Sequence, residues 1–82
     1  MVDVNQTEKD MIKNAVGNRI NELCEQRGLT INALAVKSKV PPSTLKNIVY
    51  GQVENTGIET LAKLCGGLGV SLEEFFSSEL FK

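Results

Sequence analysis

The residues of this chain best suited to binding chemistry are the cations and short polar side chains between Leu29 and Tyr50. This stretch contains three lysines (Lys37, Lys39 and Lys46) and no acidic residue, so it carries +3, whereas the whole chain carries −1. Its positive charge is therefore local, and a surface that attracts anions is expected here. Exposed lysines by themselves are more often merely solvated, so the interpretation depends on the elements that hold them.

Two short helices joined by a turn account for this stretch. Thr30 is a favourable N-cap for a helix from Ile31 to about Ser38. Pro42 suits the first turn of a second helix, which ends near Tyr50. Such a helix–turn–helix holds its second helix where side chains can enter a DNA major groove, which is about 12 Å wide. Together with the positive charge and the absence of acidic residues in this stretch, the pattern predicts a sequence-specific DNA-binding domain.

The length and composition of the chain indicate a single domain over residues 1–82, with residues 1–7 expected to be flexible. The composition, 41% apolar and 23% charged, is typical of a globular protein. No run reaches the roughly 18 apolar residues of a membrane span. The start of the sequence lacks the apolar core of a signal peptide, so a cytoplasmic location is expected.

The inventory of reactive side chains argues against an enzyme and against a metal centre. The chain has two cysteines and no histidine, whereas structural zinc normally needs four such ligands. Cys24 and Cys65 are expected to be buried free thiols, with a lone disulfide as the less favoured alternative. No phosphate-cradling loop or paired-carboxylate site is present, so no catalytic residue, cofactor or small-molecule ligand is predicted.

The rest of the chain predicts three further helices. Thr7 can cap the first, although Gly17 weakens it by about 1 kcal/mol and its start can lie later. Gly28 is expected to end that helix, and Gly66-Gly67 with Gly69 to end the fourth. Ser71 with Glu74 forms a capping box for a short fifth. The expected fold is all-α, five helices around one core. Its expected core positions are Ile12, Val16, Ile20, Leu23, Cys24, Leu34, Ala35, Leu45, Ile48, Val49, Ile58, Leu61, Ala62, Leu64, Cys65, Leu68, Leu72, Phe75 and Phe76.

From about residue 18 to residue 76 the chain resembles the Xre, Cro and lambda-repressor type of helix–turn–helix domain. The matching segments are NRINEL, RGLTINALA, VPPSTLKNI, a YG stop and GIETLAKLCGGLGVSLEEFF. The resemblance implies a lambda-repressor-like bundle whose third helix contacts double-stranded DNA. It also implies a repressor-like regulator that acts as a homodimer on a palindromic operator.

Carried over by position, the resemblance assigns base contacts to Pro42, Ser43, Lys46 and Asn47. Lysine can donate to guanine O6 or N7, and asparagine can pair bidentately with adenine. Ser43 discriminates weakly, and Pro42 can only touch a thymine methyl or fill space. The residues assigned to the DNA backbone are Thr30, Ile31, Asn32, Lys39, Thr44, Tyr50, Gln52 and Asn55.

Three positions depart from the family pattern. Ile31 stands where relatives often have a glutamine, and Lys39 stands at a turn position where they prefer glycine. Cys24 and Val49 occupy the places of a buried arginine and its glutamate partner, so both charges are absent together. Replacing such a pair by apolar residues is often neutral or stabilising, which leaves the fold assignment intact.

The rival interpretation is a protein-interaction module, for example an antitoxin-like partner, built on the same fold. It is supported by the low net charge and by the apolar C-terminal end. Phe75, Phe76, Leu80 and Phe81 exceed what one small helix can bury, so they either pack as core and tail or form a dimer contact.

Overall fold

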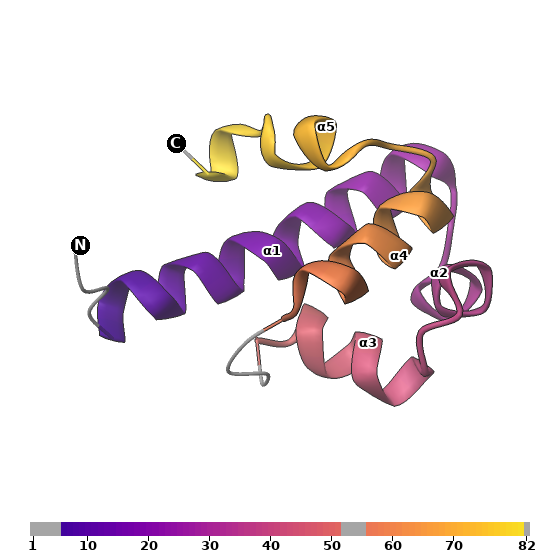
Figure 1. Ribbon diagram of the computed structural model, residues 1–82, viewed down its shortest axis with the longest axis horizontal. Coiled ribbons are helices and arrows are strands. Elements are labelled where there is room, and N and C mark those ends of the chain that lie inside the picture. The colour runs from indigo at the N-terminus through magenta and orange to yellow at the C-terminus, as the bar shows by residue number, and fades with distance from the viewer. Residues whose placement is uncertain (1–5, 52–55, 82) are drawn as a thin grey trace.

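The computed structural model describes residues 6–51 and 56–81, and within these ranges it is entirely helical. Five α-helices and a short 3-10 helix follow one another along the chain (Figure 1). They are α1 (Gln6–Arg27), α2 (Ile31–Ser38), α3 (Pro42–Val49), α4 (Ile58–Leu68), α5 (Leu72–Phe76) and η1 (Glu79–Phe81). The predicted all-α architecture of five helices is confirmed.

The 22-residue α1 forms the axis of the molecule. Helices α2 and α3 lie on one side of it, and α5 and η1 lie on the opposite side, as Figure 1 shows. Helix α4 packs against α1, α2 and α5 and so connects the two sides. The helix–turn–helix is therefore separated from the C-terminal segment by the body of α1.

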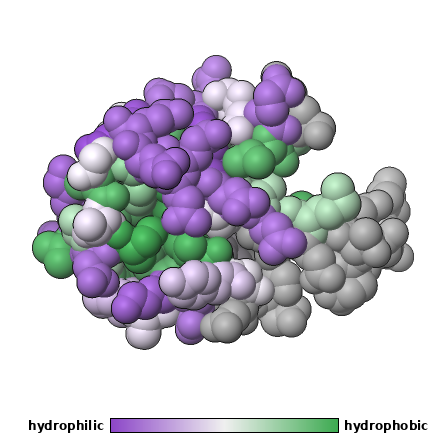
Figure 2. All heavy atoms as spheres, turned by 180° about the vertical axis from the view of Figure 1, so that it is seen from behind, coloured by the Kyte–Doolittle hydropathy of each residue, from purple (hydrophilic) through white to green (hydrophobic). Residues whose placement is uncertain are grey.

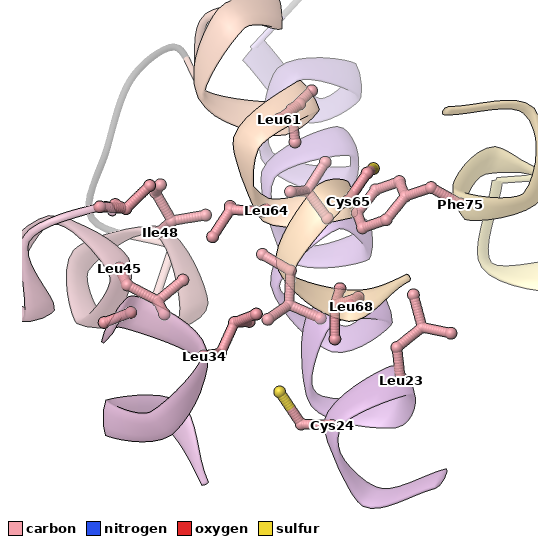
Figure 3. Close-up of a cluster of buried hydrophobic side chains, with 14 residues drawn as sticks. Leu23, Cys24, Leu34, Leu45, Ile48, Leu61, Leu64, Cys65, Leu68 and Phe75 are labelled. Atoms are coloured by element: carbon pink, nitrogen blue, oxygen red, sulfur yellow. The ribbon is translucent and has the colours of Figure 1, made fainter. Parts of the chain in front are cut away.

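One apolar core joins the five α-helices. Leu34, Leu45 and Ile48 of the helix–turn–helix face Leu64 of α4, and Phe75 enters from α5 (Figure 3). Of these side chains, Leu34, Leu45, Leu64 and Phe75 are completely buried. A core of this kind is what fixes α2 and α3, because helices of eight residues are unstable alone.

Four expected core positions are instead on the surface. Ile12 is 54% exposed because the N-terminal end of α1 extends beyond the helices packed on it (Figure 1). Ile58, the first residue of α4, is 64% exposed, and Phe76 of α5 is 39% exposed. Ala62 is also exposed, on the outer side of α4.

Local capping chemistry sets most helix ends as expected. Gly28 adopts φ +64° after α1, and Ser71 Oγ accepts a hydrogen bond of 3.0 Å from the Glu74 amide at the start of α5. Two ends differ from expectation. Helix α1 begins at Gln6, so Thr7 lies inside it. Helix α4 continues through Gly66 and Gly67, and Gly69 is its C-cap at φ +74°.

Candidate nucleic-acid interface

Helix α2 begins at a side-chain cap and ends in a tightly bonded turn. Thr30 Oγ1 accepts a hydrogen bond of 3.0 Å from the Ala33 amide, which satisfies one of the free N–H groups of the first turn. At the other end, the buried Ser38 hydroxyl donates to the Leu34 carbonyl at 2.7 Å. The start of this eight-residue helix is therefore defined by a side-chain cap, and its last turn carries an additional bond from a buried hydroxyl.

The turn between α2 and α3 depends on an unusual backbone conformation at Lys39. Its φ of 59° and ψ of 35° are left-handed, as expected at a position where relatives prefer glycine. A non-glycine residue there costs about 1–2 kcal/mol. Next to it Val40 is buried, and its amide donates to the Ala35 carbonyl at 3.1 Å. The turn therefore anchors Val40 in the core while Lys39 remains exposed.

Helix α3 has one buried face and one polar face. Leu45 and Ile48 are buried, with exposed fractions of 0% and 4%. Ser43, Lys46 and Asn47 are exposed. Because residues four apart lie on one side of a helix, Ser43 and Asn47 share a face, and Lys46 lies next to Asn47. The structure thus presents a lysine and two short polar side chains together on the outside of the helix–turn–helix.

Two glycines set how closely the helix–turn–helix approaches the bundle. A Cβ atom added to Gly17 of α1 would lie 2.5 Å from the Val49 carbonyl oxygen of α3. One added to Gly67 of α4 would lie 3.0 Å from Leu34 Cδ1 and 3.1 Å from Ser38 Cβ, both in α2. Helix α3 is therefore held at a distance from α1 that a larger residue at Gly17 would not permit, and a larger residue at Gly67 would require α2 to shift slightly.

The distribution of charge makes the outer surface of α2, the turn and α3 positive. Lys37, Lys39 and Lys46 are exposed, and the segment from Leu29 to Tyr50 has no acid. Three basic side chains outside this segment are instead paired with carboxylates. These ion pairs are Arg19–Glu22, Arg27–Glu74 and Lys63–Glu59.

The structure places most residues assigned to the DNA backbone at the surface. Thr30, Asn32, Lys39, Thr44 and Tyr50 are exposed. Ile31 differs, because its half-buried side chain packs against the core and leaves only its backbone available. The remaining two, Gln52 and Asn55, lie outside the described residues.

Arg19 is a buried cation that the sequence reasoning missed. It is 8% exposed, and it donates from Nε to the Phe75 carbonyl and from Nη2 to the Glu74 carbonyl, each at 2.8 Å. Glu22 pairs with its remaining nitrogen. Arg19 therefore satisfies the last carbonyls of α5. Its position three residues after Val16 and four before Leu23, on the apolar stripe of α1, was the available signal.

The two thiols are part of the core. Cys24 and Cys65 are free and buried, as expected, with exposed fractions of 4% and 3%. Burial raises the pKa of each thiol above its ordinary value, because the thiolate would lose its hydration. Both thiols are therefore protonated near neutral pH and act as small apolar groups. Cys24 and the half-buried Val49 fill space where the family pattern has an ion pair.

Comparison with known families agrees with this geometry. The helix-turn-helix family HTH_3 matches residues 20–75, which cover α1 from Ile20 onward, the whole of α2, α3 and α4, and all but the last residue of α5. The chain belongs to this family. It is a helix–turn–helix DNA-binding domain of the Xre, Cro and lambda-repressor type, and regulators of this type are typically not enzymes.

A solved structure of an HTH_3 family transcriptional regulator from Vibrio cholerae superposes on this domain with a TM-score of 0.80 and 30% sequence identity. The match covers 88% of this chain and 40% of that one, so this chain spans two fifths of the length of its relative. The comparison with curated proteins gives no match. Within residues 6–51 and 56–81, no helix has the length and apolar character needed to cross a membrane.

Proposed function

We propose that this HTH_3 domain is a sequence-specific transcriptional regulator of the repressor-like type that acts in the cytoplasm and inserts α3 into the DNA major groove. The observation that carries the proposal is the division of α3 into a buried apolar face and an exposed polar face. Leu45 and Ile48 fix the helix in the core, while Lys46 and Asn47 face outward in a segment without acids. In this role Lys46 donates to guanine, Asn47 pairs with adenine, and Ser43 makes a weaker contact.

The start of α2 would hold the phosphate backbone. The amides of Ile31 and Asn32 have no carbonyl partner within the helix, and the helix dipole attracts an anion there. Thr30 and Asn32 are exposed beside these amides. Lys39, Thr44 and Tyr50 flank α3 and are proposed as further backbone contacts, with Gln52 and Asn55 from the segment that follows.

In vitro selection of bound oligonucleotides from a random duplex library tests this function directly. A palindromic motif with guanine and adenine in each half-site is expected. Affinity for the selected duplex should fall by about 10³–10⁵ between 50 and 200 mM salt if a dimer contacts roughly 6–10 phosphates. Failure to enrich any motif, or an affinity for duplex DNA that is independent of salt, would contradict the proposal.

We further propose that the protein binds DNA as a homodimer. Support comes from exposed apolar residues in the N-terminal part of α1 and in the C-terminal segment. Met11 and Ile12 of α1 are 65% and 54% exposed, and Phe76 and Leu80 are each 39% exposed. Apolar surface lies between the C-terminal end and the N-terminal part of α1 (Figure 2). All four residues lie outside the family-matched segment, residues 20–75.

The same apolar surface supports a second candidate function, in which this domain binds a different protein. Exposed aromatic and aliphatic side chains of this kind are characteristic of interaction sites. The two candidates differ in their salt response and in their partner. A protein contact through Phe76 and Leu80 would persist at high salt and would not require duplex DNA.

A further inference from the structure

The start of α3 is apolar, in contrast to the capped starts of α2 and α5. Pro41 occupies the N-cap position with φ −56° and ψ 137°, and Pro42 is the first helical residue. Helix α3 has no side-chain cap, whereas Thr30 and Ser71 cap the other two helices. Both prolines are exposed. Two adjacent pyrrolidine rings therefore cover the end of the helix proposed to enter the groove.

This arrangement also removes hydrogen-bond donors from the end of the helix. Proline has no N–H group, and the Leu45 amide is already bonded to the Pro41 carbonyl at 3.0 Å. Between Pro41 and Leu45, only Ser43 and Thr44 therefore keep a backbone N–H to offer. An approaching base edge would meet CH₂ groups at Pro41 and Pro42.

The charges around the two rings favour DNA as their partner. Lys39 precedes them, Lys46 follows one turn later, and no acid lies between Leu29 and Tyr50. The major groove displays one apolar group, the C5 methyl of thymine. The polar edge atoms of guanine, cytosine or adenine would lose water against proline without gaining a partner, which is unfavourable.

We infer that Pro41 and Pro42 select thymine by contact with its methyl group, an inference that rests on the proposed major-groove function. The position of the thymine follows from helix geometry. Pro42 and Lys46 lie on one side of α3 and are separated along its axis by about 6 Å. That distance is roughly two base-pair steps. Each half-site should therefore contain a thymine within about two base pairs of the base contacted by Lys46.

The test replaces thymine by uracil, one position at a time, in the duplex enriched by selection. Uracil differs from thymine only by the missing methyl, and the protein itself is unchanged. Burial of one methyl group corresponds to about a fourfold change in Kd. Affinity is expected to fall about fourfold at one thymine per half-site, and about fifteenfold when both half-sites are substituted.

A Pro42→Ala variant shows whether the effect belongs to the rings. Alanine is accepted in the first turn of a helix, and its fold can be checked by thermal melting. At the responsive position Pro42→Ala should bind thymine and uracil duplexes with more nearly equal affinity, whereas Lys63→Ala, which changes an exposed residue of α4, should retain the parent's preference for thymine. Retention of the full thymine preference by both Pro42→Ala and Pro41→Ala would overturn the inference.

The outcomes separate this inference from the proposed function. Tight, sequence-specific binding with no thymine in the half-site, or with no response to any uracil, would overturn thymine selection and leave the proposed function standing. Absence of specific binding to any duplex would overturn both.

Discussion

Individual side chains on α3 carry the proposed sequence preference, and they can be removed without disturbing the core. Lys46 and Asn47 are exposed, whereas the neighbouring Leu45 and Ile48 are buried. Lys46→Ala and Asn47→Ala are each expected to reduce discrimination by about 1–3 kcal/mol per lost base contact. Competition binding between the selected site and single-base variants measures this, and thermal melting should show an unchanged fold.

Lys63→Ala is a suitable control for Lys46→Ala. Lys63 is an exposed lysine of α4 paired with Glu59 at 3.8 Å, so its loss removes one charge away from α3. It should leave base preference unaltered. If Lys46→Ala and Asn47→Ala bind the selected site with the parent's affinity and preference, the assignment of base contacts to α3 is wrong.

Arg19 has a structural role that its charge alone would not indicate. Arg19→Met removes the donors of the Phe75 and Glu74 carbonyls and leaves Glu22 without its partner. A destabilisation of about 2–4 kcal/mol is expected, because buried charged hydrogen bonds are lost and the Phe75 carbonyl loses its donor, whereas the Glu74 carbonyl keeps a bond of 2.8 Å from the Ser77 hydroxyl. Urea denaturation of the variant and the parent gives the difference in the free energy of unfolding.

Arg27→Met provides the matched comparison. Arg27 is also in α1 and lies 3.6 Å from the Glu74 carboxylate, but this pair is partly exposed, with side-chain exposures of 30% and 54%. Its loss should cost less than about 1 kcal/mol. Equal effects of the two substitutions would show that Arg19 acts as an ordinary surface cation.

At the scale of helices, Gly17 is the glycine with the least space for a side chain. Gly17→Ala gains up to about 1 kcal/mol of helix propensity. The new methyl group would, however, overlap the Val49 carbonyl oxygen, from which it would lie 2.5 Å, so α3 must move away from α1. A net destabilisation of roughly 1–2 kcal/mol is expected. Binding to the selected site should also weaken, since base contacts depend on the position of α3.

Gly66→Ala in α4 isolates the effect of helix propensity from that of steric overlap. Nothing lies within 4 Å of a Cβ atom at this position. The substitution should stabilise the protein by about 0.5–1 kcal/mol and leave DNA binding intact. Equal stabilisation by both substitutions, measured by urea denaturation, would mean that α1 and α3 tolerate a wider separation.

Most helix ends could be predicted from the sequence because capping is local. Thr30 and Ser71 each accept a bond from an amide three residues ahead, and Gly28 adopts positive φ beside its own helix. Contacts between distant segments could not be predicted in this way. Arg19 meets carbonyls 55 and 56 residues away, so a pattern of neighbouring residues cannot reveal them.

Periodicity indicates which face of a helix is apolar but not how far its packing partner extends. Ile12 follows the stripe of α1, yet it is exposed because the other helices end before reaching it. Gly17 is the opposite case. Its low helix propensity counts against a helix at this position, yet its lack of a side chain allows α3 to approach α1 closely. For the site, the sequence predicted the two helices and the positive surface. The assignment of individual residues to bases or phosphates stays a prediction.

The whole molecule places its two candidate binding surfaces on opposite sides of α1. Helix α3 lies on one side, and α5 and η1, which carry the exposed Phe76 and Leu80, lie on the other (Figure 1). Rings of Phe75, Phe76 and Phe81 contact one another, with centroids 4.9–6.0 Å apart, so η1 is anchored on this side. A partner could therefore bind the C-terminal surface without covering Lys46 or Asn47.

A homodimer formed through this surface leads to a specific expectation for two single substitutions. Met11 and Leu80 are exposed in the monomer, at 65% and 39%, so Met11→Glu and Leu80→Glu should leave the fold intact. A buried charge without a partner would strongly destabilise a dimer contact. Sedimentation equilibrium should therefore show dissociation of the dimer, and affinity for a two-half-site duplex should fall toward that for a single half-site.

Ile58→Glu is the control, because Ile58 is an exposed apolar residue of α4, at 64%, within the family-matched segment. It should leave the dimer intact if the interface lies at Met11 and Leu80.

A dimer that binds a two-fold operator should protect two half-sites about 34 Å apart, one turn of the duplex. A monomeric mass for the parent protein at high concentration, with one half-site protected, would exclude the homodimer. It would also favour a different protein as the partner of this surface.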